Sequence, residues 1–104
     1  MTILTEDTTD RMFKTKHVKS IVMIGEEYCK YCTAIKPFFE TMSQIYTDIN
    51  FYYLPSSLAV NISKKVSYEG IPAVVSIYNG RVVDIKEGGD VDNIISLIDT
   101  LVYL

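Results

Sequence analysis

The chain has 104 residues, enough for one domain with a modest core, and it is 48% hydrophobic and 22% charged. This composition excludes a disordered chain, and a net charge of -3 without a basic stripe argues against a nucleic-acid partner. No apolar run approaches the ~18 residues of a membrane span, and residues 1–7 lack the basic start and apolar segment of a secretory signal. We therefore expect a single domain over residues 1–104, monomeric and cytoplasmic, with no membrane partner.

The N-terminal part of the chain predicts two strands with a short helix between them. Ile3-Leu4 suits a short edge strand, and Thr8–Asp10 supplies caps for the short helix. The continuous apolar run Val18–Ile24 predicts a central strand that is covered on both faces.

A longer helix is predicted after Cys29 and Cys32. Pro37 should kink this helix without ending it, because proline removes one intrahelical hydrogen bond while the apolar period resumes in phase beyond it. The apolar residues that recur at helical spacing are Ile35, Phe38, Phe39, Met42, Ile45 and Tyr46.

A strand over Ile49–Leu54 follows, and Pro55–Ser57 then caps a predicted short helix. The apolar residues of that helix lie at i+4 spacing: Leu58, Ile62 and Val66.

The C-terminal part predicts a hairpin and a closing helix. Strands over Ala73–Tyr78 and Arg81–Lys86 flank Asn79-Gly80, a strong two-residue hairpin signal. Gly88-Gly89 ends the second strand, and Asp90 caps the last helix. The face of that helix expected to be buried carries Val91, Ile94, Ile95, Ile98, Leu101 and Val102.

The predicted order is thus βαβαβαββα. Alternating units give right-handed parallel crossovers, and the hairpin adds an antiparallel pair to the same sheet. The fold class is α/β, a three-layer α/β/α sandwich with a central mixed sheet.

Cys29 and Cys32 are the only cysteines, and they lie where a buried strand runs into a helix. In a reducing cytoplasm a permanent structural disulfide is disfavoured, whereas a redox-cycling pair is expected. On one helix face, residues i and i+3 lie within the ~4.4–6.8 Å Cα separation that a disulfide tolerates. Helix amides near Cys29 should lower the pKa of its thiol. Lys30 would add to this effect, while Glu26 and Glu27 would oppose it. Cys29 is then the nucleophile and Cys32 the resolving thiol.

Two other interpretations of the pair carry no redox chemistry. A zinc site needs about two more ligands, and the chain offers only His17 and carboxylates, so we expect no metal. A coincidental pair of packed cysteines is the other alternative. A CxxC near a β-α unit favours redox chemistry over both.

With these residues placed, the sequence resembles the thioredoxin family over nearly its whole length. The resemblance lies in Tyr28-Cys29-Lys30-Tyr31-Cys32 after a strand, in Pro37, in Gly70-Ile71-Pro72 about 40 residues after the second cysteine, and in Gly88 about 16 residues further on. It implies a thioredoxin fold with a cis-proline loop, in which Pro72 is cis and packs beside the cysteines.

The resemblance also implies a substrate groove. The backbone of Ile71 would pair with an extended substrate peptide, as in strand addition. The residues implied to line the groove with Ile71 and Pro72 are Tyr28, Tyr31, Gly88 and Gly89.

Several residues depart from the family pattern. Lys30-Tyr31 stands where thioredoxins usually have Gly-Pro, and Tyr28 stands where they have tryptophan. Met23 replaces the buried aspartate that assists proton transfer to the resolving thiol, and Tyr53 aligns with the lysine that usually neighbours that aspartate. The usual proton route for Cys32 is therefore absent.

The resemblance implies a protein-disulfide reductase with no bound cofactor, which receives electrons from a thioredoxin reductase and NADPH. A glutathione-coupled, glutaredoxin-like enzyme is the first alternative, because Tyr31, Gly88-Gly89 and Asp92 at a helix start are similar to glutaredoxins. A thioredoxin-fold binding module without redox turnover is the second.

Overall fold

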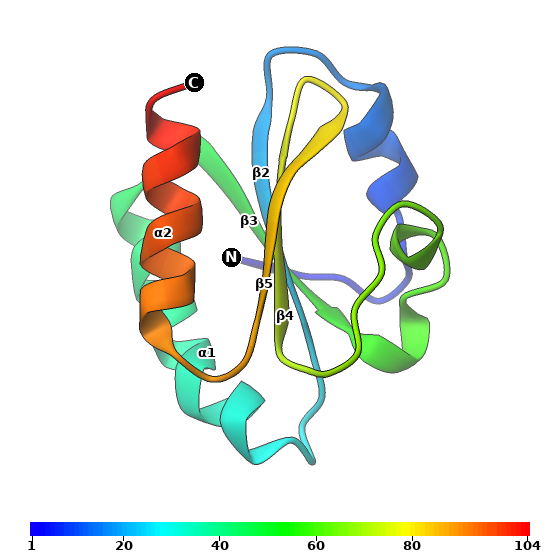
Figure 1. Cartoon of the computed structure of the whole chain (residues 1–104), viewed down its shortest axis with the longest axis vertical. Helices are drawn as coiled ribbons and strands as arrows, with labels where there is room; N and C mark the ends of the chain where they lie inside the picture. The colour runs from blue at the N-terminus through cyan, green and yellow to red at the C-terminus, as the bar shows by residue number, and fades with distance from the viewer.

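The computed structural model describes residues 1–104 (Figure 1). Its strands are β1 (Thr2–Ile3), β2 (Lys19–Gly25), β3 (Ile49–Pro55), β4 (Ala73–Tyr78) and β5 (Arg81–Glu87), and its α-helices are α1 (Lys30–Ile45) and α2 (Val91–Val102). Three short 3-10 helices are η1 (Thr9–Lys14), η2 (Ser56–Leu58) and η3 (Ile62–Lys64). The ends of all five strands lie within one residue of the sequence prediction.

The five strands form one sheet in the order β1-β3-β2-β4-β5. β3 pairs in parallel with both β1 and β2, whereas β4 is antiparallel to both β2 and β5. Asn79 and Gly80 both have positive φ, which closes the β4–β5 hairpin with a tight turn. The predicted mixed sheet and hairpin are therefore confirmed.

The sheet has an apolar core on each face. The face with Met23 and Tyr53 packs against α1 and α2, and the face with Val22 and Leu54 packs against η1 and the segment between β3 and β4. Figure 1 shows α1 and α2 on one side of the sheet, with the blue 3-10 segment and the green segment on the other. The molecule has three layers, and only one outer layer contains α-helices.

The helix that we predicted through Leu58, Ile62 and Val66 is wrong, since this segment forms η2 and η3 instead. The amides of Asn61 and Ile62 donate to Asp7 Oδ2 at 2.8 and 2.9 Å, and so do not bond to carbonyls one turn earlier. Ile62 and Val66 are still buried against the sheet, so the apolar spacing serves the core without a helix.

Helix α1 continues through Pro37, as predicted. Pro37 lies on the exposed side of the helix, and the buried side carries Ile35 and Phe39. The Phe39 ring meets Phe51 of β3 edge-to-face with ring centroids 5.1 Å apart. This contact anchors the helix that carries the cysteines onto the sheet.

The predicted apolar face of α2 is only partly correct. Val91, Ile95 and Val102 are 36%, 41% and 44% exposed, so they do not belong to the core. Leu97, which the prediction omitted, is fully buried. The residues of α2 that pack on the sheet are Ile94, Leu97, Ile98 and Leu101. Neither this helix nor α1 combines the length and the apolar run that crossing a bilayer requires.

Candidate active site

The two cysteines lie where the central strand β2 leads into α1. They form a disulfide with Cα atoms 5.2 Å apart. Cys29 is the N-cap of α1, and its Sγ accepts a hydrogen bond from the Cys32 amide at 3.2 Å. A helix N-terminus favours negative charge on a capping atom, so this position stabilises a Cys29 thiolate once the disulfide is reduced.

The two sulfur positions differ in access. Cys29 is half-buried, whereas Cys32 has no exposed surface. An external disulfide can therefore meet Cys29 but not Cys32.

The loop before β4 lies next to Cys29. The Ile71–Pro72 peptide bond is cis, and the Ile71 carbonyl oxygen is 3.7 Å from Cys29 Sγ. The Gly88 amide donates to the Pro72 carbonyl oxygen at 2.9 Å, which joins this loop to the end of β5. The backbone of Ile71 is thus held next to Cys29.

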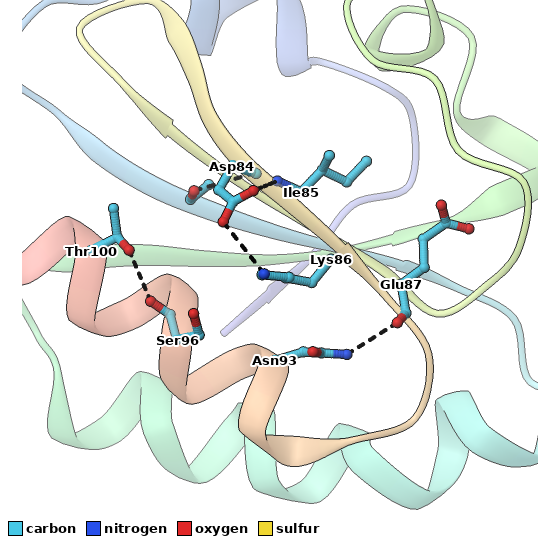
Figure 2. Close-up of polar contacts among 8 residues, drawn as sticks. Asp84, Ile85, Lys86, Glu87, Asn93, Ser96 and Thr100 are labelled. Atoms are coloured by element: carbon cyan, nitrogen blue, oxygen red, sulfur yellow. Dashed lines mark hydrogen bonds and ion pairs between the residues drawn. The ribbon is translucent and has the colours of Figure 1, made fainter.

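Glu87 holds the same loop through hydrogen bonds, a role that the sequence did not predict. Its Oε1 accepts hydrogen bonds from the amides of Gly70 at 2.7 Å and Glu69 at 3.1 Å. Figure 2 shows the Asn93 side chain in the first turn of α2 donating to the Glu87 carbonyl oxygen, at 3.0 Å. The only sequence signal was an acidic residue directly before Gly88, which by itself indicates no partner.

Two exposed tyrosines flank the cysteines. Tyr28 and Tyr31 are 83% and 63% exposed. The Tyr31 side chain lies on Gly89, where an added Cβ would be 2.9 Å from Tyr31 Cβ. Gly88 has a φ of +106°, a conformation that glycine adopts readily. The structure thus brings Tyr31, Gly88 and Gly89 to the same side as Pro72, and leaves Tyr28 open to solvent.

The acidic residues before the cysteines are not equivalent. Glu26 Oε1 accepts from the Ser57 amide at 2.7 Å and from the Ser56 hydroxyl at 2.9 Å. The Ser57 amide, followed by the Ser56 hydroxyl, lowers the pKa of the Glu26 carboxyl. Glu26 thus ties the active-site loop to the end of β3. Glu27 is exposed, as is Lys30.

Tyr53 on β3 lies under this loop, and it is only 3% exposed. Burial raises the pKa of its hydroxyl, and the negative charges of Glu26 and Glu27 add to the increase. The Lys36 ammonium lies 4.4 Å from the centre of the Tyr53 ring, a cation–π arrangement. The sequence alone marks Tyr53 only as a departure from the family pattern.

Other candidate sites lie elsewhere. His17 is near the β4–β5 hairpin, where its amide donates to Asn79 Oδ1 at 2.9 Å. No group of three histidine, cysteine or carboxylate side chains is arranged to hold a metal ion. Neither surface pocket is lined by a cysteine. One lies along the first half of β3, next to Met1 and Thr2, and the other lies beside the β4–β5 hairpin.

A half-buried sulfur at a helix N-terminus, disulfide-bonded to a buried partner one turn later, is the site of a thiol–disulfide oxidoreductase. The thioredoxin family profile matches residues 1–100. The chain therefore belongs to the thioredoxin family.

Solved structures agree with this assignment. A thioredoxin of Plasmodium falciparum superposes with a TM-score of 0.84 at 25% identity, over 96% of this chain and 98% of that one. A Fasciola hepatica thioredoxin gives 0.84 at 20% identity, over 97% and 99%. Thioredoxin f2 in its complex with ferredoxin:thioredoxin reductase gives 0.83 at 18% identity, over 95% and 92%. A comparison with curated protein sequences gave no significant match.

Proposed function

We propose that this chain reduces disulfides of other proteins, with Cys29 as the attacking thiol and Cys32 as the resolving thiol. The observation that carries the proposal is the asymmetry of the pair. Cys29 is half-buried and its Sγ accepts a hydrogen bond from the Cys32 amide, whereas Cys32 is fully buried. The proposed setting is a monomer in the cytoplasm, to be checked by size-exclusion chromatography and cell fractionation.

The reaction proceeds in two exchanges. The Cys29 thiolate attacks a substrate disulfide, so that a Cys29–substrate bond forms and one substrate sulfur leaves as a thiolate that takes a proton from water. The Cys32 thiol loses its proton to water and attacks Cys29 Sγ, which releases the second substrate thiolate. The substrate gains two electrons and two protons, and the Cys29–Cys32 disulfide forms.

The surroundings of Cys29 support an extended peptide as substrate. The Ile71 carbonyl oxygen lies 3.7 Å from Cys29 Sγ, and a substrate strand would pair with this backbone. Tyr31 on Gly89 would form one wall of this groove, and Pro72 and Gly88 its floor. Tyr28 is proposed to contact the substrate from the other side of Cys29.

A thioredoxin reductase that draws electrons from NADPH is the proposed electron donor. A thioredoxin f2 of this fold is known in complex with ferredoxin:thioredoxin reductase, which supports a reductase as the partner. The glutathione alternative has weaker support, because the Asp90 side chain accepts from the Asp92 amide at 2.9 Å. A glutathione carboxylate bound at the start of α2 would have to compete with Asp90 for that amide.

The roles of the two cysteines are tested by two variants. Cys29→Ser should abolish reduction of insulin disulfides, and Cys32→Ser should accumulate a mixed disulfide visible on non-reducing gels. Thr33→Ser, on an exposed position of the same helical turn, is the control and should retain activity. Undiminished turnover by Cys29→Ser would contradict the proposal.

The electron donor is tested by comparing two reducing systems on the same oxidised protein. Thioredoxin reductase with NADPH should reduce the disulfide faster than glutathione with glutathione reductase. A response to glutathione alone would favour the glutaredoxin-like alternative. A Cys29 thiol that reacts with iodoacetamide with a midpoint near ~8.5, the value of a free cysteine, would favour the binding module.

A further inference from the structure

The resolving thiol lies in surroundings that oppose its ionisation. Cys32 is fully buried, and the strand beneath it contributes Met23, which is fully buried and apolar on the face that packs against α1. Burial away from water disfavours a thiolate, which is the form that must attack in the second exchange. A hydrogen-bond donor close to Cys32 Sγ is therefore needed for efficient resolution.

Gly25 at the end of β2 leaves a small space beside Cys32. An added Cβ there would lie 3.1 Å from Cys32 Sγ and 2.8 Å from the Tyr53 hydroxyl oxygen. The sulfur and the hydroxyl therefore border the same space, and only a glycine at this position leaves it open. In the register of the sheet, Tyr53 pairs with Met23, so its ring reaches the cysteines across the apolar face of β2.

Tyr53 is suited to donate a hydrogen bond. Its buried ring is fixed between the sheet and α1, where the Lys36 ammonium lies 4.4 Å from the ring centre. Burial, followed by the charges of Glu26 and Glu27, raises the pKa of the hydroxyl, so it keeps its proton at neutral pH. A protonated hydroxyl next to a thiolate donates a charge-assisted hydrogen bond, which is stronger than one between neutral groups.

We propose that the Tyr53 hydroxyl donates a hydrogen bond to Cys32 Sγ once the disulfide is reduced, and thereby stabilises the thiolate that resolves the mixed disulfide. The inference rests on the resolving role proposed above for Cys32. The proton of the Cys32 thiol goes to water, and Tyr53 keeps its own proton throughout. The bond that forms joins Cys32 Sγ to Cys29 Sγ, and the bond that breaks joins Cys29 Sγ to the substrate sulfur.

Other titratable groups also act on Cys32. Lys36, one turn later on α1, favours the thiolate, whereas Glu26 and Glu27 in the preceding loop oppose it. Cys29 is absent as a titrating neighbour in a Cys29→Ser background. A test must therefore separate Tyr53 from Lys36.

The first measurement needs no turnover. In the Cys29→Ser background, the pH midpoint of Cys32 thiolate formation is followed by absorbance at 240 nm. Tyr53→Phe, which removes only the hydroxyl, should raise this midpoint by about one pH unit, a tenfold loss of thiolate at fixed pH. Tyr52→Phe, the adjacent tyrosine on the opposite face of the sheet, is the matched control and should leave it unchanged. Lys36→Met should raise it by less.

The second measurement isolates the resolving step. Reduced protein with both cysteines reacts with an aromatic disulfide that releases one chromophore on attack by Cys29 and a second on resolution by Cys32. In Tyr53→Phe the first release should keep its rate. The second should slow about threefold at neutral pH, because the tenfold thiolate loss is partly offset by the greater nucleophilicity of a more basic thiolate. At pH values above both midpoints the order should reverse, because both thiolates are then fully formed and the more basic thiolate of Tyr53→Phe attacks about threefold faster.

An unchanged midpoint in Tyr53→Phe would overturn the inference, even if the protein reduces disulfides. A larger shift in Lys36→Met than in Tyr53→Phe would also overturn it, because it would assign the role to the lysine. The titration does not depend on redox activity. If the protein failed to reduce disulfides, the measured effect of Tyr53 on the pH midpoint of Cys32 would still be valid.

Discussion

Asp7→Asn is the substitution for which the structure gives the clearest magnitude. The buried Asp7 carboxylate accepts from the amide and hydroxyl of Thr9 on one oxygen, and from the amides of Asn61 and Ile62 on the other. An asparagine has one acceptor oxygen, so its NH2 group would face one of these two pairs of donors. Each unpaired buried donor costs about 1–3 kcal/mol, and the Thr9 hydroxyl can turn away. We expect a loss of about 2–4 kcal/mol.

Such a loss is large compared with the total stability of ~5–15 kcal/mol of a small domain. Urea unfolding should show a lower midpoint with an unchanged slope, and the melting temperature should fall by about 10–20 °C. Asp10→Asn, an exposed position in the same segment, is the control. A loss below about 0.5 kcal/mol in Asp7→Asn, or one equal to that of Asp10→Asn, would refute the reasoning.

The same carboxylate predicts a pH dependence. Burial alone would raise the pKa of Asp7, but the hydrogen bonds from Thr9, Ile62 and Asn61 together hold it below its ordinary value of 3.8. The unfolded chain therefore binds more protons than the folded one as the pH falls. The stabilisation is complete well above pH 3.8 and is lost as the pH falls through the folded pKa. The stability difference between the natural chain and Asp7→Asn should narrow over that range.

Two further substitutions test the surroundings of the cysteines. Gly89→Ala should displace Tyr31, because the new Cβ would lie 2.9 Å from Tyr31 Cβ, and should lower kcat/KM for a protein disulfide about three- to tenfold. Gly70→Ala, whose new Cβ has an ordinary 3.6 Å contact with Glu87 Oε1, is its control, and equal losses in both would contradict the expectation. Glu87→Ala frees the amides of Glu69 and Gly70, and should raise KM severalfold with little change in kcat. A loss confined to kcat would show that Glu87 does not position the substrate loop.

The sheet was readable from the sequence because its signals are local. The continuous apolar run that became β2 is typical of a central strand covered on both faces, and Asn79-Gly80 specifies a tight turn by itself. Pro37 was tolerated within α1 because it lies on the solvent side.

The failed predictions depended on contacts distant in the chain. The spacing of Leu58, Ile62 and Val66 fits an α-helix, but Asp7 takes the amides that the helix would use. Similarly, Val91 and Ile95 fit the period of α2 and are nevertheless exposed, because the helix packs on the sheet through Ile94, Leu97, Ile98 and Leu101.

The active site was predictable in part. Two cysteines at the start of a helix specify the reacting atoms, with Cys29 at the cap position and Cys32 in the first turn. Tyr53 lies on β3, which pairs with β2, and Glu87 lies on β5, which pairs with β4. These strands come next to the cysteines and the Pro72 loop only in the folded molecule. The side chains of Tyr53 and Glu87 carry no motif, so only the structure brings them to the cysteines and the loop.

The Asp7 carboxylate joins the two segments of the 3-10 layer opposite the helices, and this has a consequence for native-state dynamics. The amides of Thr9, Asn61 and Ile62 all donate to Asp7, although Asn61 and Ile62 lie 54 and 55 residues after it. In hydrogen exchange they should open in one shared event, below the free energy of global unfolding, while the amides of β2 and α1 stay protected. This layer leads directly into the loop before Pro72, so its opening would also release the backbone that faces Cys29.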